Sequence, residues 1–523
     1  MSGSDSPQPR PSGSDFLQPR ATGSDFLQPR ATGSDFLQPR ATGSDFLQPR
    51  ATGSDFLQLR AGDAPARGLT GWLADGLRTA IAGGRLAAGS RLPATRLLAA
   101  ELGIARGVVV QAYQRLIDEG LATARTGSGT VVTGPPAGPA AGSAPEFPAG
   151  DRRRALGGLR LPASTPDGIE IDLSPGVPDL SAFPRAAWLR AERAVLDRIT
   201  TADLGYGDPG GAPRLRGEVV RWLARTRGVR AAADDVVICA GVAQGLALLA
   251  RILNSEEAVA VEDPGSRGTG DQLAFWGMRP VGVPVDDEGL RVDELAGTGL
   301  RTVVVTPAHQ FPTGVVLSPA RRRALLDWPG LIIEDDYDAE HRYDRAPVAA
   351  LQGSAPERVA YLGSVSKTLA PGMRMGWLIP PPRLRGALLA AKHASDLGNP
   401  ALPQLVLAEL LASGAHDRHL RAVRTRQRRR RDALLAGLRT HLPQARFAGV
   451  AAGLHLLVQP PGDVDDTVLA ARIAAAGVLV HPLSWHRRRP GPPGLVLGYA
   501  AHSPDRLAEA AARIGRVISR PGP

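Results

Sequence analysis

Residues 169–523 alternate short apolar runs with helical patterns, and this alternation constrains the fold more than any other feature of the chain. An apolar run of about four to eight residues between turn signals is typical of a strand that is buried on both faces. Strands that alternate with helices predict an α/β domain with a mostly parallel sheet. The runs that we interpret as buried strands are 236–240, 258–262, 302–306, 331–334, 359–363 and 375–379.

The bulk composition indicates an anionic partner and a reducing compartment. The 523 residues carry a net charge of +11, which favours nucleic acid as the partner, although a generally arginine-rich proteome would give the same balance. The single cysteine, Cys239, excludes an intrachain disulfide. The sequence contains neither an apolar stretch of about 18 residues nor an apolar signal core near its start. We therefore expect a cytoplasmic protein with no membrane segment.

Two segments are poor candidates for folded structure. Residues 11–60 are five copies of a ten-residue unit whose only large apolar side chains are Phe and Leu. Such units cannot bury enough surface to offset the entropy of ordering, so we predict a disordered tail over 1–66, with an interaction tail as the alternative. Residues 135–168 are rich in Pro, Gly and Ala and predict a linker. The folded regions are then 67–134 and 169–523.

Residues 67–134 predict three helices followed by two strands that flank a tight turn. The second helix is expected over 96–102, with Thr95 as its N-cap, and the third from about 105 to 119. The strands are expected over 121–124 and 130–133. The apolar face of the first helix, which Gly83 and Gly84 end, comprises Trp72, Leu73, Leu77, Ala80 and Ile81.

This order of elements describes a winged helix-turn-helix, whose third helix enters the major groove of DNA. Arg106 begins that helix, and arginine is the usual partner of guanine. Gly107 would let the backbone approach the phosphates, and Gly127 lies in the turn of the wing. Arg96 and Arg125 would contact the DNA backbone from the second helix and from the wing. A small helical dimerisation domain is the alternative.

The DNA-binding interpretation gains support from a resemblance to the GntR-type winged helix. The segments that carry it are 92–99, 102–107, 112–116 and 127–131. The resemblance implies double-stranded DNA as a partner. The sequence departs from the family at Ala105 and Val108, where Ser and Thr are usual. Two hydroxyls that contact phosphate are thus absent, which leaves the target sequence and the affinity open.

One lysine indicates the chemistry of the larger region. All but two of the 62 basic residues are arginine, and the two lysines are Lys367 and Lys392. Arginine stays protonated, whereas a lysine amine can lose its proton and attack an aldehyde. Lys367 is preceded by Ser364 and Ser366 and followed by Arg374, which is typical of a pyridoxal phosphate lysine. Lys392 lacks such surroundings and shows that a lysine can also survive by chance.

Other parts of a cofactor site occur in the same region. Gly241 lies between a strand and a helix, where free N–H groups suit a phosphate, and the serines and arginine around Lys367 supply further donors. A buried strand ends in Asp335, whose carboxylate could keep a pyridine nitrogen protonated. Tyr337 could bond the ring hydroxyl, and the loop 307–314 is expected along the ring edge.

These parts, together with 175–179 and 204–211, resemble the fold-type-I aminotransferases over most of 169–515. A GntR-like winged helix, a linker and an aminotransferase-like domain, in this order, are typical of the MocR subfamily of GntR regulators. The resemblance implies a multidomain chain, with a small α+β winged helix and a large α/β domain. It also implies that Lys367 carries the Schiff base and that Tyr206 reaches the phosphate from the partner subunit of a homodimer.

Several positions depart from the aminotransferase pattern. Val242 and Ala243 stand where a hydroxyl or an amide usually helps to bind the phosphate. Ser266 replaces an aromatic residue that stacks on the ring. Val496 replaces the arginine that binds the substrate carboxylate, although the arginines of 487–489 are near in sequence and could substitute for it.

The sequence therefore predicts a transcription regulator that depends on pyridoxal phosphate and senses this cofactor or an amino-acid-like effector, without efficient turnover. An aminotransferase with an accessory winged helix is the alternative, and a DNA-binding protein with a decayed cofactor site is the third hypothesis. We interpret the arginines of 421–431 as a solvated helix face rather than a second DNA patch. His341, His393 and His455 lack metal-ligand spacing, so we expect local hydrogen bonds there and no metal.

Overall fold

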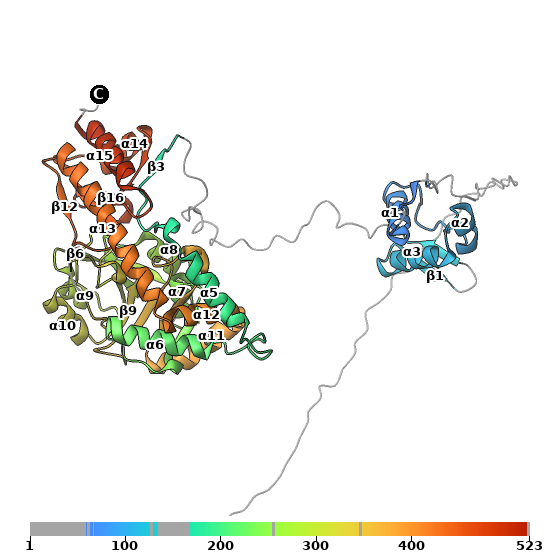
Figure 1. The fold of residues 1–523 in the computed structure, drawn as a ribbon, viewed down its shortest axis with the longest axis horizontal. Helices are drawn as coiled ribbons and strands as arrows, with labels where there is room; N and C mark the ends of the chain where they lie inside the picture. Colours follow the sequence, from blue (N-terminus) through green and yellow to red (C-terminus); the bar gives the residue numbers. More distant parts are fainter. Residues whose placement is uncertain are drawn as a thin grey trace, which may run out of the picture. The chain divides into compact units, whose positions relative to one another are not determined.

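The computed structural model describes residues 59, 63–65, 67–125, 129–133, 168–253, 257–344 and 348–519. The chain divides into two compact units, of residues 1–146 and 147–523, and each is described by itself (Figure 1). The predicted tail over 1–66 and the predicted linker over 135–168 lie almost entirely outside the described residues. Within the described ranges, no helix combines the length and the apolar composition that a membrane crossing requires.

The N-terminal unit is a winged helix-turn-helix, as the sequence predicts. Its apolar core fills the space between the three helices and includes Leu73, Leu98 and Leu116, all fully buried. The two strands pair antiparallel, with Ala122 opposite Val132. The elements are α1 Leu69–Ala82, α2 Thr95–Glu101, α3 Arg106–Asp118, β1 Ala122–Arg125 and β2 Gly129–Val132.

The start of α2 differs from the sequence prediction. Thr95 is the first helical residue, and the N-cap is Ala94, whose ψ of 134° is extended. The Thr95 hydroxyl does not cap the helix, because it instead accepts a hydrogen bond from Arg106 Nε at 3.3 Å. The prediction of Thr95 as N-cap is therefore wrong by one position, and its side chain links α2 to the start of α3.

The larger unit is built on an eight-stranded sheet with the order β4-β11-β10-β9-β8-β5-β6-β7. The pairs among β10, β9, β8, β5 and β6 are parallel, whereas β11 and β7 run antiparallel to their neighbours. The mostly parallel sheet of the sequence prediction is thus confirmed. The strands are β4 Val237–Cys239, β5 Ala258–Asp263, β6 Arg279–Asp286, β7 Gly289–Leu290, β8 Thr302–Val305, β9 Leu331–Asp336, β10 Val359–Ser364 and β11 Gly376–Ile379.

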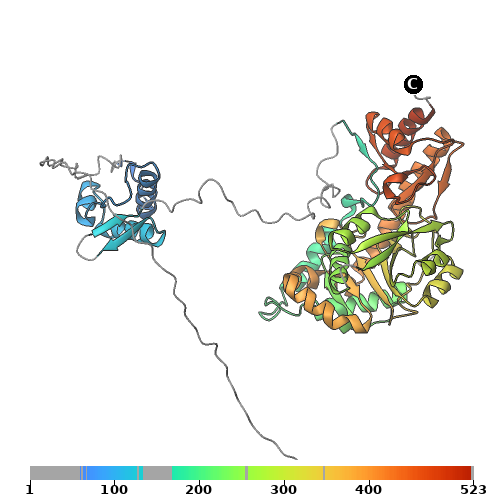
Figure 2. The same cartoon turned by 180° about the vertical axis from the view of Figure 1, so that it is seen from behind.

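Helices cover both faces of this sheet (Figure 2). Ile333 of β9 belongs to the core under α7, α8 and α11, whereas its neighbour Ile332 belongs to the core under α9 and α10. A further core under α6 and α12 contains Tyr361 and Trp377. The helices are α5 Arg185–Leu196, α6 Pro213–Arg227, α7 Val242–Ile252, α8 Arg267–Phe275, α9 Val292–Gly297, α10 Pro319–Asp327, α11 Pro382–Asp396 and α12 Ala401–Ala412.

The C-terminal part has a sheet and a core of its own. The sheet has the order β12-β13-β16-β15, and the core lies between it and helices α13, α14 and α15. The elements are β3 Ile171–Asp172, α13 Ala415–His441, β12 Arg446–Ala448, β13 His455–Gln459, α14 Asp466–Ala475, β14 Val478–Leu479, β15 His481–Pro482, β16 Leu495–Gly498 and α15 Pro504–Ser519. Short 3-10 helices are Leu180–Ala182, Ala233–Asp235, Ala339–His341, Pro371–Met373 and Leu483–His486.

A buried ion pair holds the carboxyl end of β9 against α6. Arg227 Nε and Nη2 donate to the two carboxylate oxygens of Asp336 at 2.6 and 3.0 Å, and both side chains are fully buried. The Tyr361 hydroxyl donates to the same carboxylate at 2.5 Å. Glu334, two residues earlier on the strand, accepts hydrogen bonds from the backbone N–H groups of Leu351 and Gln352.

Removal of Arg227 should destabilise this unit. In Arg227→Met, the Asp336 carboxylate would remain buried without its partner, which costs about 3–5 kcal/mol of unfolding free energy. Denaturant unfolding of the full chain measures the loss. The matched control is Arg225→Met, because Arg225 pairs with Asp417 at the surface and should contribute at most about 1 kcal/mol. Equal losses for the two variants would contradict the role given to the buried pair.

Candidate functional site

Lys367 lies in the loop after β10, and its side chain contacts the loop that contains Gly176. Its Nζ donates a hydrogen bond to the Gly176 carbonyl at 2.5 Å. Burial lowers the pKa of the amine, although the charges of Asp338 and Asp335 act to raise it. Gly176 has a φ of +83°, and a Cβ added there would lie 3.3 Å from Nζ. The lysine is thus confined but keeps an amine that loses its proton more readily than a solvated one.

Asp335 lies on the opposite face of β9 from its two acidic neighbours. Successive side chains of a strand alternate between faces, so the contacts of Glu334 and Asp336 on one face direct Asp335 to the other. Its Oδ1 is buried and has no hydrogen-bond partner among the described residues. Burial, followed by repulsion from Asp336, raises the pKa of this carboxyl to about 7. An unpartnered acceptor here fits the protonated nitrogen of a pyridine ring.

The residues predicted to bind phosphate come together where two strands end beside the start of a third. Cys239 pairs with Gly376, and Gly376 pairs with Ser364, so β4 and β10 end on either side of the first residue of β11. Beyond β4, Gly241 has a φ of +86° and precedes the first turn of α7. The Arg374 guanidinium lies over it, because a Cβ added to Gly241 would be 3.2 Å from Arg374 Nη2.

Further hydrogen bonds are made by these phosphate-site residues. Arg374 Nη2 donates to the Ala240 carbonyl, and Ser364 Oγ accepts the Ser366 N–H at 3.3 Å. Three residues after Gly241, the Gln244 amide bonds within the chain: its Oε1 accepts the Ala240 N–H at 2.7 Å and its Nε2 donates to Asp396 at 2.6 Å. The arrangement of N–H groups, hydroxyls and one guanidinium fits a phosphate.

The two tyrosines of the prediction have different surroundings. The Tyr337 hydroxyl lies 3.2 Å from His309 Nδ1, and burial raises the pKa of the phenol well above its usual range. Tyr206 is 88% exposed, so it does not line the site of its own chain. The exposure of Tyr206 is what a residue that serves a second subunit requires.

The structure gives local roles to the residues that depart from the aminotransferase pattern. Ser266 caps α8 by accepting the Thr269 N–H at 3.2 Å. Val496 is fully buried and packs against Leu457 and Leu483. The residue that we predict to replace the carboxylate-binding arginine therefore lies in an apolar cluster.

The arginines that follow the 3-10 helix Leu483–His486 divide between two places. Arg487 and Arg488 help to line a cavity of about 290 Å³, together with Ser266, Arg267 and His486. Arg489 is directed elsewhere, because its Nη2 donates to the Gly282 carbonyl at 2.9 Å. Two of the three arginines thus lie beside the position of the missing aromatic residue.

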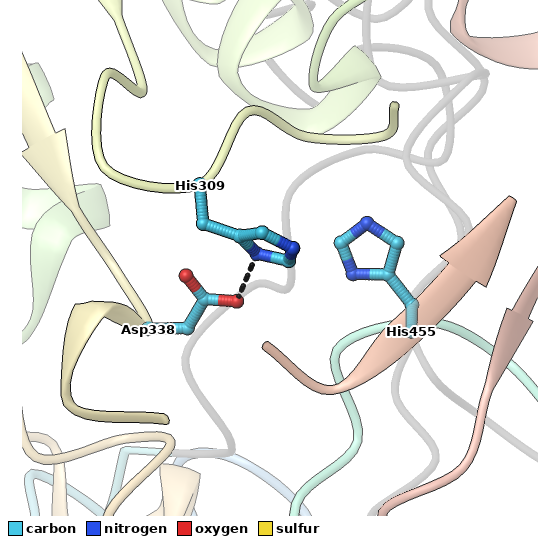
Figure 3. A group of neighbouring side chains, drawn as sticks. All are labelled: His309, Asp338 and His455. Carbon is cyan, nitrogen blue, oxygen red and sulfur yellow. Dashed lines mark hydrogen bonds and ion pairs between the residues drawn. The ribbon is translucent and has the colours of Figure 1, made fainter. Parts of the chain in front are cut away.

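No role for His309 is predicted from the sequence, although the loop 307–314 that contains it is expected along the ring edge. His309 Nδ1 lies 2.8 Å from Asp338 Oδ2, and His455 lies next to this pair (Figure 3). His341 and His455 make the local hydrogen bonds expected of them, to the carbonyls of Lys367 and Pro312. A spacing argument could not find His309, because Asp338 lies 29 residues away.

Several arginines of 421–431 bond within the chain, whereas Arg421, Arg428 and Arg429 are exposed on α13. Arg426 and Arg430 both contact the Asp179 carboxylate, at 2.7 and 2.8 Å. Arg424 donates to the Glu340 carbonyl. These contacts favour a structural helix face over a second DNA patch.

In the winged helix, Arg106 and Gly107 are exposed at the start of α3, and Arg96 is exposed on α2. Arg125 ends β1, whereas Gly127 lies outside the described residues. Ala105 is the N-cap of α3 and has no side chain to cap it. Arg96 lies in the first turn of α2, and Arg106 and Gly107 lie in the first turn of α3. In a helix-turn-helix, the start of the second helix of the motif contacts base edges, and the first helix crosses the DNA backbone.

Comparison with known proteins identifies the family. Residues 70–132 match the bacterial regulatory proteins of the gntR family, 169–514 match aminotransferase class I and II, and 2–63 match a domain of unknown function, DUF1720. The probable rhizopine catabolism regulatory protein MocR of Rhizobium meliloti is 33% identical, covering 83% of this chain and 90% of that protein. The pyridoxine biosynthesis regulator PdxR of Corynebacterium glutamicum is 33% identical, covering 86% and 95%. The chain belongs to the MocR-type GntR regulators.

Solved structures bear out the fold of the larger unit of this MocR-type regulator. A Pyrococcus horikoshii kynurenine aminotransferase, solved with PMP, has a TM-score of 0.63 at 27% identity and covers 71% of this chain and 95% of its own. LysN of Thermus thermophilus, complexed with a phosphopyridoxyl-leucine, has a TM-score of 0.62 at 28% identity and covers 70% and 96%. The cofactor of the unit is pyridoxal phosphate, and the predicted resemblance to the MocR subfamily is confirmed.

Substitution of Lys367 should abolish covalent retention of the cofactor. The wild-type chain with pyridoxal phosphate should show a visible absorption band that survives desalting, and Lys367→Ala should lose it, because the other lysine of the sequence, Lys392, is paired with Asp396. The control is Lys392→Met, since Lys392 is buried in an ion pair with Asp396 and should not bind the aldehyde. A wild-type chain without the band would instead support a decayed cofactor site.

Proposed function

We propose that this MocR-type protein regulates transcription in response to pyridoxal phosphate or to an amino-acid-like effector that binds beside it. One combination carries the proposal: a cofactor cradle, formed by Lys367, Asp335, Tyr337 and the phosphate-binding residues, lies in the same chain as a winged helix. Val496, which we align with the carboxylate-binding arginine, is buried among apolar side chains. A site that retains the cofactor without holding a substrate firmly suits sensing better than turnover.

In this proposal each residue of the cradle has one role. Pyridoxal phosphate, when bound, supplies an aldehyde that reacts with amines and a ring that withdraws electrons. Lys367 attaches the cofactor, Asp335 accepts the hydrogen of the ring nitrogen, and Tyr337 contacts the ring hydroxyl. Gly241 and the donors of Ser364, Ser366 and Arg374 hold the phosphate.

We infer that the regulator works as a homodimer in the cytoplasm. The motivating observation is Tyr206, whose exposure suits a residue that completes the phosphate site of a partner. Effector binding would then change the placement of two DNA-binding domains together. Light scattering tests the assembly, and a monomer that retains the cofactor tightly would sink the idea.

The DNA interface assigns different roles to two arginines. We expect Arg106→Ala to cost about 1–3 kcal/mol of binding free energy on the operator and to relax specificity at one base pair. We expect Arg96→Ala to weaken all sequences alike and to reduce the salt slope by about one. Fluorescence anisotropy on an operator selected from random duplexes measures both, and equal losses of Arg106→Ala on operator and random DNA would refute the assignment.

Turnover distinguishes a sensor from an aminotransferase. With Val496 and Ser266 in place of the arginine and the aromatic residue, substrate and ring should be held loosely, and a misplacement of about 1 Å can cost roughly a hundredfold in rate. Common amino acids should therefore convert the cofactor to pyridoxamine phosphate well below about 1 per second. Conversion at or above that rate, followed by absorption, would favour the aminotransferase hypothesis.

A further inference from the structure

Two histidines and one aspartate converge at the seam between the large and the small core of the cofactor unit. His309 comes from the loop after β8, Asp338 from the turn after β9, and His455 is the first residue of β13. One ligating atom of each lies within 4.8 Å of the other two. Figure 3 shows the three side chains directed toward one another. All three are at most 4% exposed.

The hydrogen bonding of His455 leaves one ring nitrogen free. Its Nε2 lies 3.2 Å from the Pro312 carbonyl, which can only accept, so Nε2 carries the hydrogen. Nδ1 therefore presents a bare lone pair, and it is buried without a partner among the described residues. An unpartnered lone pair inside a protein is costly unless a cation or a donor meets it.

The facing pair supplies negative charge. The Asp338 carboxylate is buried, and an oxygen of it lies within 4.8 Å of a ring nitrogen of His455. Its Oδ2 lies 2.8 Å from His309 Nδ1, a hydrogen bond that the two side chains would exchange for contacts with an ion.

Gly453 packs directly against the facing pair. It has a φ of +74°, and a Cβ added to it would lie 2.0 Å from His309 Cε1, 2.4 Å from His309 Nδ1 and 2.8 Å from Asp338 Oδ2. Any other residue would therefore displace the two side chains that converge here. The Tyr337 hydroxyl, 3.2 Å from His309 Nδ1, borders the same pair.

We propose that His309, Asp338 and His455 form a binding site for a divalent transition-metal ion of the Zn²⁺ class. Two imidazole nitrogens and one carboxylate oxygen are the ligand set of such ions, which hold them at about 2.0–2.2 Å. Tetrahedral ligands at that distance are roughly 3.4 Å apart. The most distant pair would therefore approach by at most about 1.4 Å from the 4.8 Å limit of the cluster, and the 2.8 Å pair of His309 and Asp338 would separate by about 0.6 Å. On binding, the ion takes the Nδ1 lone pair of His309, and the hydrogen of that ring moves to Nε2.

The ion would join two parts of the unit that otherwise have separate cores. His455 belongs to the small sheet, whereas His309 and Asp338 follow strands of the large sheet. Metal binding should therefore stabilise the seam as well as occupy the site, since a ligand that binds the folded state raises its stability. The proximity of Tyr337 places this ion beside the residue that we assign to the ring hydroxyl.

The test uses the full chain, loaded with pyridoxal phosphate, desalted and stripped of metal by a chelator. Titration with ZnCl₂ in a calorimeter should give one saturable site per chain, and a thermal scan should show a higher melting temperature with Zn²⁺. Loss of a residue that only supports a ligand weakens metal affinity about 10–100-fold, so loss of a ligand in His455→Gln or Asp338→Asn should weaken it by at least about 100-fold. The absorption band of the lysine-bound cofactor reports that each variant is folded.

The matched control is His416→Gln. His416 is also buried, and both of its ring nitrogens lack partners among the described residues, but it lies outside the cluster. It should bind Zn²⁺ as the wild type does. Absence of a saturable site in the wild type, or equal affinity of His455→Gln and wild type, would overturn the proposal without affecting the proposed regulatory function.

Discussion

The cofactor unit depends on the buried ion pair between Arg227 and Asp336. The pair fixes the end of β9 against α6, and Tyr361 of the next strand bonds to the same carboxylate. Because side chains alternate along a strand, holding Asp336 on one face places Asp335 on the other, where its free oxygen meets the site. A slip by one residue would exchange the two acids. The position of the acid that we assign to the ring is thus set by a contact on the far side of the sheet.

The central strands could be predicted because they are buried on both faces, which requires continuous apolar runs such as 302–306 and 359–363. β6 was missed since Pro280 and Pro284 lie within it, and prolines usually argue against a strand. The two prolines are tolerated in β6 because this strand lies next to the end of the sheet, beside the two-residue β7. The strands of the small sheet are short, and their pairing depends on contacts between distant segments, which a local pattern does not contain.

Some residues of the candidate site could likewise be predicted from the sequence, whereas others could not. Lys367, its serines and Arg374 lie within a single stretch of sequence, so their chemistry could be inferred from neighbours alone. The contact of His309 with Asp338, and the aim of His455 into the same space, arise only when β8, β9 and β13 come together. The predicted N-cap at Thr95 failed for a related reason, because its hydroxyl is taken by Arg106 from the following helix. Local preference yields where a tertiary partner competes for the same atom.

The packing of Val496 also bears on how such a regulator evolves. Val496 lies in a small apolar cluster with Leu457 and Leu483, on the opposite face of β16 from Leu495 and Leu497. Restoring an arginine by one substitution would bury a guanidinium among aliphatic side chains, with no anion to meet it until a substrate arrived. The neighbours would have to become smaller or more polar first, and each such step alone opens a cavity. A single Val496→Arg substitution is therefore expected to destabilise the small sheet rather than to create a carboxylate-binding site.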